Sequence, residues 1–232
     1  MTAKIVWRPR GENAQRMLIA GRSGMGKTTL ARHLAGRSGP AVWVDPKGLN
    51  EAEWPVTVRA DRFVDLAGSS ARAGHLRTLL QEHTRIVVQL GDRPDYGDPQ
   101  AGDKRQVDAV AEACYVSGNV LFACDDMQGV YDSRPSYFLH RAATMGRSRG
   151  VGSLCLVTSV IGFPLDFLRS ANHIVAFAQH EEAEVDRLNK AVAGLGDQAR
   201  ALEPYEYVWA DLDQRIVQVC APLQIGSGVQ AH

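Results

Sequence analysis

The chain has 232 residues, of which 45% are hydrophobic, and its 26 basic and 26 acidic side chains give a formal net charge of zero. This length and apolar content allow a sizeable core, and we expect a single domain over residues 1–232 because no linker interrupts the pattern. A neutral chain has no overall basicity of the kind that indicates a nucleic-acid partner, although charge can still be arranged locally.

The four cysteines indicate neither a zinc site nor a disulfide framework. They form no CxxC or CxxH pair and lie mostly within apolar runs, which favours small core residues in a reducing compartment. The N-terminus has no apolar stretch of signal-peptide length, and no segment approaches the span of a membrane helix. We therefore expect a soluble, cytoplasmic protein without a transmembrane segment.

Apolar runs alternate with helical patterns along the chain. Most runs are continuous, which is typical of strands covered on both faces. The predicted strands are 17–21, 41–45, 85–90, 119–125, 152–159 and 173–178. The predicted helices are 28–36, 75–83, 104–116, 136–147, 164–171 and one beginning near residue 181. This order predicts an α/β fold with a mostly parallel, doubly wound sheet.

The C-terminal part has a different pattern. Residues 205–211 and 215–221 are two strand-like runs separated by three residues, which predicts a terminal antiparallel hairpin. Two tracts rich in Gly, Pro and Asp, 91–103 and 129–136, are predicted loops.

A phosphate-binding motif follows the first predicted strand. The sequence reads GxxxxGKT, with Gly21, Gly26, Lys27 and Thr28 at its fixed positions. Glycines let the backbone N–H groups turn toward phosphate oxygens, while the following helix adds its positive dipole end. We expect Lys27 to reach the β- and γ-phosphates of ATP and the Thr28 hydroxyl to bind Mg²⁺. The predicted ATP-binding residues are Gly21, Arg22, Ser23, Gly24, Met25, Gly26, Lys27, Thr28 and Thr29.

Two adjacent carboxylates end the fourth predicted strand, NVLFACDD. We expect this strand to lie next to the strand that precedes the P-loop, so that Asp125 serves as the Walker B carboxylate in the Mg²⁺ shell. Asp126 would then orient and deprotonate the attacking water. This second acid is often Glu in such enzymes, so the shorter Asp126 has to lie nearer to the γ-phosphate.

Spacing and motifs together carry a family resemblance. Two further predicted strands lie between Lys27 and Asp125, and an extra strand between the Walker strands resembles motor ATPases with a RecA-like core. The segments "VWVDPKG" and "CDDMQ…LHRAATMGRSRGVGSLCLVTSVIGFP" resemble the FtsK/HerA superfamily of DNA-pumping ATPases, over about residues 16–180. Within it, the short form and the paired acids are most similar to viral genome-packaging ATPases.

The resemblance implies further site residues. Thr158, after the strand that follows Asp125, corresponds to a polar sensor of the γ-phosphate, although Ser159 stands where the family often has Gln. Arg147 or Arg149 in MGRSRG is expected to enter a neighbouring subunit's site in a homo-oligomeric ring, a hexamer. Alternatively, these arginines form a solvated basic helix end.

The implied function is ATP-driven translocation of double-stranded DNA, packaging a viral genome into a preformed capsid, with a capsid or portal component as partner. A translocase contacts the DNA backbone without reading bases, and the candidate contacts are Lys104, Arg105 and Arg134. Three alternatives remain: a conjugation or filamentous-phage assembly ATPase, a small-molecule kinase, and a nucleotide-dependent switch.

Overall fold

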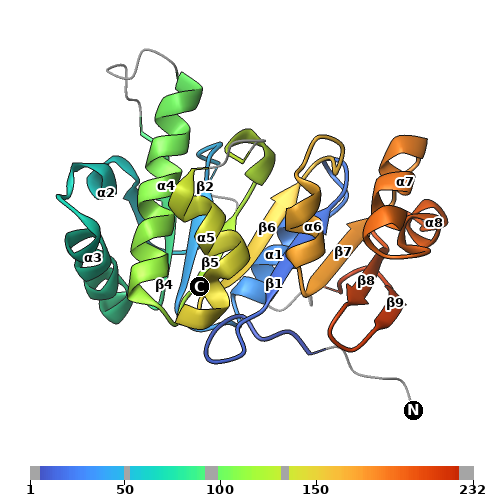
Figure 1. Cartoon of the computed structure of the whole chain (residues 1–232), viewed down its shortest axis with the longest axis horizontal. Helices are drawn as coiled ribbons and strands as arrows, with labels where there is room; N and C mark the ends of the chain where they lie inside the picture. Colours follow the sequence, from blue (N-terminus) through green and yellow to red (C-terminus); the bar gives the residue numbers. More distant parts are fainter. Residues whose placement is uncertain (1–5, 50–52, 92–98, 132–135, 225–232) are drawn as a thin grey trace, which may run out of the picture.

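A mixed sheet extends through the protein. The computed structural model describes residues 6–49, 53–91, 99–131 and 136–224, and in these ranges nine strands form one sheet in the order β3-β4-β2-β5-β6-β1-β7-β8-β9 (Figure 1). The strands are β1 (Arg16–Ala20), β2 (Ala41–Asp45), β3 (Thr57–Arg59), β4 (Arg85–Gln89), β5 (Leu121–Cys124), β6 (Gly152–Val157), β7 (His173–Phe177), β8 (Tyr207–Asp211) and β9 (Ile216–Cys220).

The pairing divides the sheet into two parts. All neighbours from β3 to β7 are parallel, whereas β7, β8 and β9 are antiparallel to one another. The predicted mostly parallel sheet with a C-terminal antiparallel hairpin is therefore confirmed. The carboxyl ends of the parallel strands meet at one edge, where α/β proteins bind their ligands.

Helices cover the sheet. They are α1 (Lys27–Ala35), α2 (Asp61–Asp65), α3 (Ser69–Glu82), α4 (Pro99–Ser117), α5 (Tyr137–Met145), α6 (Leu165–Ser170), α7 (Glu182–Ala191) and α8 (Leu195–Arg200). In Figure 1, α2 and α3 lie at the β4 end of the sheet, while α7 and α8 lie at the β8 end. Two short 3₁₀ helices, η2 (Met127–Gly129) and η3 (Gly146–Arg149), follow β5 and α5.

The sheet separates two apolar clusters. One joins alternate strand residues such as Leu18 and Val42 to α3 through α8, and the other joins Met17 and Trp43 to α1. The cluster residues of the central strands β1, β2, β4, β5 and β6 are fully buried, as continuous apolar runs predict. Burying both faces also holds the strand ends, and the loops that follow them, in fixed positions.

The strand order corrects one expectation. Strand β5, which precedes Asp125, is not next to β1, because β6 lies between them and pairs in parallel with both. The extra strand between β1 and the strand that precedes Asp125 is therefore β6, which comes after both of them in the sequence.

Several boundaries also differ from the prediction. Strand β3 and helix α2 were not predicted, since β3 has three residues with two of them exposed. Helix α4 begins at Pro99, inside the predicted 91–103 loop, and proline is well suited to a first helical turn. The predicted loop 129–136 lies partly outside the described residues. The last predicted helix is two helices, since Gly194 adopts a left-handed conformation between them.

The cysteines occupy the expected positions. Cys114, Cys124 and Cys155 are buried thiols, and Cys220 is half-buried. Burial raises the pKa of the Cys114 and Cys155 thiols well above the usual value, so both are neutral core side chains. Among the described residues, no helix has the length and hydropathy needed to cross a bilayer.

Candidate functional site

Two glycines shape the turn between β1 and α1. Gly26 has φ +97° and occupies the position before the first residue of α1, a conformation that favours glycine. Gly21 is required for a steric reason, because a Cβ at this position would lie only 2.7 Å from the Cβ of Phe177 on β7. The turn therefore depends on glycine at both positions, and helix α1 begins at Lys27 as predicted.

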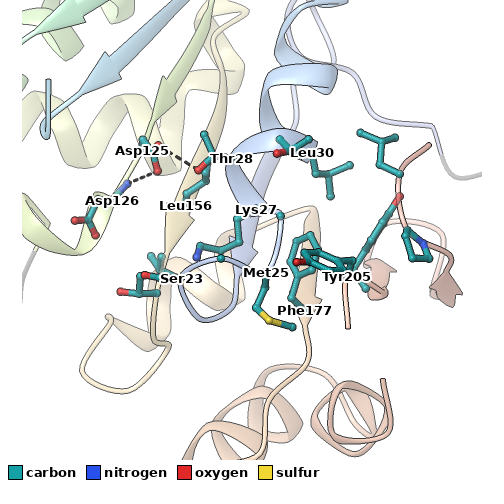
Figure 2. A pocket seen from close by; sticks show the side chains of 18 of the residues that line it. Ser23, Met25, Lys27, Thr28, Leu30, Asp125, Asp126, Leu156, Phe177 and Tyr205 are labelled. Carbon is teal, nitrogen blue, oxygen red and sulfur yellow. Dashed lines mark hydrogen bonds between the residues drawn. The ribbon is translucent and has the colours of Figure 1, made fainter. Parts of the chain in front are cut away.

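Lys27 and Thr28 lie at the start of α1. Lys27 is only 8% exposed, and its Nζ donates a hydrogen bond to the Arg22 carbonyl at 2.9 Å across the P-loop. The Thr28 hydroxyl donates to Asp125 Oδ2 at 3.4 Å, which joins the P-loop to the end of β5 (Figure 2). A hydroxyl and a carboxylate oxygen are the ligand types that Mg²⁺ prefers, so this pair fits the predicted Mg²⁺ position.

Asp126 has different partners from Asp125. Its backbone N–H donates to Asp125 Oδ1 at 2.9 Å, and its φ of +49° turns the chain sharply after β5. Its carboxylate forms an ion pair with Lys47, with Nζ and Oδ2 3.1 Å apart. The predicted general base therefore lies beside a cation that was not among the predicted site residues.

Lys47 is positioned by the turn after β2. The buried Asp45 carboxylate accepts hydrogen bonds from the N–H groups of Lys47 and Gly48, at 3.2 Å and 3.0 Å. This is the DPKG turn in the segment that carried the family resemblance, and the parallel β2–β5 pairing places it beside the carboxylates. Only the sheet order reveals that proximity.

Thr158 follows β6 and is bonded to Gln128 of η2. The Thr158 hydroxyl donates to Gln128 Oε1 at 2.9 Å, and the Ser159 N–H donates to the same oxygen at 3.2 Å. The Ser159 hydroxyl bonds to Glu184 of α7, whose other carboxylate oxygen accepts the Val160 N–H at 2.9 Å. The loop after β6 is thus fixed both to the segment after Asp126 and to α7.

One cavity of about 600 Å³ lies beside the P-loop and the ends of β5 and β6. Its walls include P-loop residues 23–29, both carboxylates, Lys47 and Thr158. In Figure 2, Asp125 and Asp126 lie on one side of the P-loop, and the rings of Phe177 and Tyr205 lie on the other. The structure therefore brings residues 23–29 of the predicted ATP-binding set together with Asp125, Asp126 and Thr158, whereas Gly21 and Arg22 do not line this cavity. It also adds Lys47 and an aromatic wall, which were not among the predicted site residues.

Arg147 and Arg149 lie elsewhere. Both are exposed in η3, before β6 begins, whereas Thr158 follows its end. Because β6 has six residues, the two ends are roughly 20 Å apart. Arg147 donates to Asn13 Oδ1 at 3.2 Å, and the Arg149 guanidinium lies 5.7 Å from the Tyr115 ring centre. Neither arginine reaches the cavity of its own chain.

The predicted DNA contacts lie on a helix. Lys104 and Arg105 belong to the first turns of α4, while Arg134 lies outside the described residues. Within the described parts of the chain, His, Cys, Asp and Glu side chains form no cluster of three that could hold a metal ion. A Mg²⁺ ion at Thr28 and Asp125 would therefore take its remaining ligands from nucleotide and water, as Mg²⁺ at nucleotide phosphates commonly does.

Comparison with known proteins identifies the fold. No family model and no curated protein matches the sequence. The structure is similar to the genome packaging NTPase B204 from Sulfolobus turreted icosahedral virus 2, in complex with AMPPCP, with a TM-score of 0.68 and 15% identity over 91% of this chain and 99% of that one. The ATP-gammaS complex of the same protein has a TM-score of 0.66 and 14% identity, over 91% of this chain and 99% of that one. B204, the DNA-packaging ATPase from Sulfolobus turreted icosahedral virus, has a TM-score of 0.62 and 16% identity, over 91% of this chain and 100% of that one.

The fold of this chain is thus similar to that of the B204 NTPases. The resemblance that the motifs predict is confirmed at the level of the fold, across nearly the whole of both chains.

Proposed function

We propose that the protein is an ATPase that drives double-stranded DNA into a viral capsid. One observation carries the proposal: the GKT loop, two carboxylates and Thr158 come from three separate segments and meet around one cavity. A phosphoryl-transfer site needs these elements, namely a phosphate cradle, a Mg²⁺ ligand, an acceptor for the proton of the attacking water and a polar group near the γ-phosphate. The fold shared with viral packaging NTPases supports the choice of DNA as the transported polymer.

Each group then has a role. The N–H groups of the P-loop and the Lys27 ammonium hold the phosphates, while Thr28 and Asp125 would bind Mg²⁺, which neutralises the charge that develops during transfer. Asp126 accepts the proton of the attacking water. Lys47, 3.1 Å from Asp126, adds positive charge beside the reacting phosphate and orients that carboxylate.

The site of one subunit is incomplete without a neighbour. The cavity lies at the carboxyl edge of the sheet, and Arg147 and Arg149 lie at the other end of β6. A head-to-tail ring, which we take to be a hexamer, brings these opposite ends together at each interface. An arginine from the next subunit would then stabilise the transition state, as trans-acting arginines do in other NTPases.

The test is phosphate release from ATP with and without double-stranded DNA. A DNA motor is stimulated by DNA in a salt-dependent way, because its contacts are mainly to phosphates. Lys27→Ala is the matched control, since it removes the cradle cation and should abolish release under both conditions. Release that needs a small-molecule acceptor would instead identify a kinase, and ATP binding without DNA-stimulated release would identify a switch.

A related conjugation or filamentous-phage assembly ATPase is the alternative within the same class. A packaging ATPase should bind a capsid or portal component, whereas an assembly ATPase should bind a membrane complex. Purifying the protein from infected cells and identifying what is recovered with it distinguishes the two. Recovery of a membrane complex without any capsid or portal component would count against packaging.

A further inference from the structure

The cavity continues past the P-loop into an end lined mainly by apolar and aromatic side chains. Phe177, Tyr205, Tyr207, Pro222 and Leu223 form its walls. This end lies across the P-loop from Asp125 and Asp126, as the positions of Phe177 and Tyr205 in Figure 2 show. Because the carboxylates mark where the terminal phosphate reacts, the aromatic end faces the opposite end of a bound nucleotide.

Tyr205 is held over this end by a strained turn. The Glu206 N–H donates to the Glu203 carbonyl at 3.1 Å, which closes a turn with Pro204 and Tyr205 at its corners. Tyr205 has φ +68°, a conformation that such turns normally give to Gly or Asn. Its side chain is nonetheless 57% exposed, so burial in the core does not offset the strain. Strained residues of this kind concentrate at functional sites, where the rest of the structure holds them in place.

The Tyr205 ring also lies close to the phosphate-binding turn. A Cβ built at Gly26 would be 3.7 Å from Tyr205 Cδ1 and 3.6 Å from Phe177 Cε1. The two rings therefore border the P-loop directly, within reach of a ligand whose phosphates occupy the cradle. Pro222 and Leu223, which follow β9, complete the apolar wall.

Few polar side-chain groups at this end could identify a base. Among the five side chains of the aromatic end, only the two tyrosine hydroxyls can form hydrogen bonds, and Pro222 has no N–H. Tyr207 pairs with Cys220 across the β8–β9 ladder and is only 8% exposed, and burial raises the pKa of its hydroxyl to about 12. An aromatic face, by contrast, stacks with any base.

We propose that this end is a base-binding subsite for nucleoside triphosphates, in which Tyr205 stacks on the base without distinguishing adenine from guanine. The proposal rests on the proposed function, because it assumes that the P-loop holds the phosphates. Affinity then comes from two separable parts: the cradle binds the triphosphate, and the Tyr205 ring adds the stacking.

The test compares ligands with and without a base. Dissociation constants of ATPγS, GTPγS and inorganic tripolyphosphate, each with Mg²⁺, are measured by calorimetry for the wild type and for Tyr205→Asn and Tyr205→Phe. Asparagine tolerates the left-handed conformation, so Tyr205→Asn removes the ring while preserving the turn. Tyr137→Ala removes another exposed tyrosine, 61% exposed on α5 and absent from the cavity walls, and serves as the control.

Tyr205→Asn should raise the dissociation constants of both nucleotides about tenfold, as expected for the loss of one stacking contact. The dissociation constant of tripolyphosphate should stay unchanged. Tyr205→Phe and Tyr137→Ala should bind all three ligands like the wild type. For the wild type, the dissociation constants of ATPγS and GTPγS should differ by less than about tenfold, because no polar contact distinguishes the two bases. Equal losses for nucleotides and tripolyphosphate in Tyr205→Asn would overturn the subsite, because the ring would then only support the cradle. A wild type that binds none of the three ligands would instead refute the proposed function itself.

Discussion

Asp125 and Asp126 are adjacent carboxylates with different surroundings. Asp125 accepts hydrogen bonds from the Thr28 hydroxyl and the Asp126 N–H, whereas the Asp126 carboxylate pairs with Lys47. Since successive positions after a strand point in different directions, one carboxylate faces the P-loop and the other faces the DPKG turn. This difference is the basis for assigning Asp125 to Mg²⁺ and Asp126 to the attacking water.

Changing each carboxylate to an amide should therefore impair a different step, hydrolysis for Asp126 and binding of Mg²⁺-ATP for Asp125. Asp126→Asn should still bind ATP with Mg²⁺, while its hydrolysis falls by about two to four orders of magnitude, the usual range for loss of a general base. Asp125→Asn should weaken binding of Mg²⁺-ATP. Measuring nucleotide affinity separately from turnover tests the assignment, and equal loss of affinity in both variants would contradict it.

Gln128 determines where the Thr158 hydroxyl points its proton. The Ser159 N–H can only donate, so the Gln128 atom that faces it is the amide oxygen. The Thr158 hydroxyl donates to that same oxygen and so turns its lone pairs away from Gln128. Gln128 therefore orients the hydroxyl of Thr158, the proposed sensor of the γ-phosphate, and we treat it as a positioning residue.

Removing this acceptor should affect turnover more than binding. Gln128→Leu leaves the Ser159 N–H without its partner, a cost of about 1–3 kcal/mol, and should lower kcat about tenfold with little change in KM. Gln128→Glu keeps an acceptor and should retain most of the wild-type kcat. If Gln128→Leu turns over ATP at the wild-type rate, the orientation of Thr158 does not depend on this contact.

At the scale of elements, the junction of β7 and β8 contains a buried titratable group. His173 is fully buried, and the Trp209 indole N–H donates to its Nδ1 at 3.2 Å. An indole N–H can only donate, so the imidazole is neutral in this arrangement. Burial lowers the pKa of His173, and the nearby Asp211 and Asp213 offset this only in part.

This pairing predicts loss of stability in mild acid. Because the pKa of His173 is lower in the folded protein, the unfolded chain takes up a proton first as pH falls below about 6.5. The free energy of unfolding should then decrease, by at most about 1.4 kcal/mol per pH unit for one proton. The Tm of the wild type should fall more between pH 7.5 and 5.5 than that of His173→Gln, which keeps an acceptor but does not titrate. Parallel pH profiles for the two proteins would rule out this role.

At the scale of the whole molecule, the proposed catalytic groups occupy opposite edges of the sheet. Parallel strands place the P-loop and the carboxylates at one edge, while η3, with Arg147 and Arg149, precedes β6 at the other. A single subunit thus presents a cavity on one side and arginines on the other. This polarity is what a head-to-tail ring requires.

Mixing two inactive variants tests the ring. An Arg147→Ala, Arg149→Ala subunit keeps its cradle, a Lys27→Ala subunit keeps its arginines, and each should be inactive alone, since a trans-acting arginine contributes about a thousandfold or more in rate. Their mixture should recover activity at interfaces where an intact cradle meets intact arginines. Sedimentation first establishes that both variants assemble. An assembled mixture that stays inactive, or a monomer with full activity, would show that these arginines do not act between subunits.

The sequence by itself determined the parts of this protein that depend on neighbouring residues. Continuous apolar runs predicted the buried strands, because a strand covered on both faces has no solvent side to leave polar. The P-loop was equally evident, since its glycines, Lys27 and Thr28 act within one turn of backbone. Short elements such as β3 and α2 were not predicted, because the hydrophobic periodicity of three to five residues is too short to identify a strand or a helix.

Only the tertiary structure decided which distant segments meet. Strand order placed β6 between β1 and β5 and brought Lys47 to Asp126, although these residues are far apart in the chain. Tyr205 reached the P-loop through the antiparallel β7–β8 pairing, which no local motif encodes. The physical reason is that sheet register depends on backbone hydrogen bonds and on the packing of both faces at once, and these are properties of the assembled core rather than of any single segment.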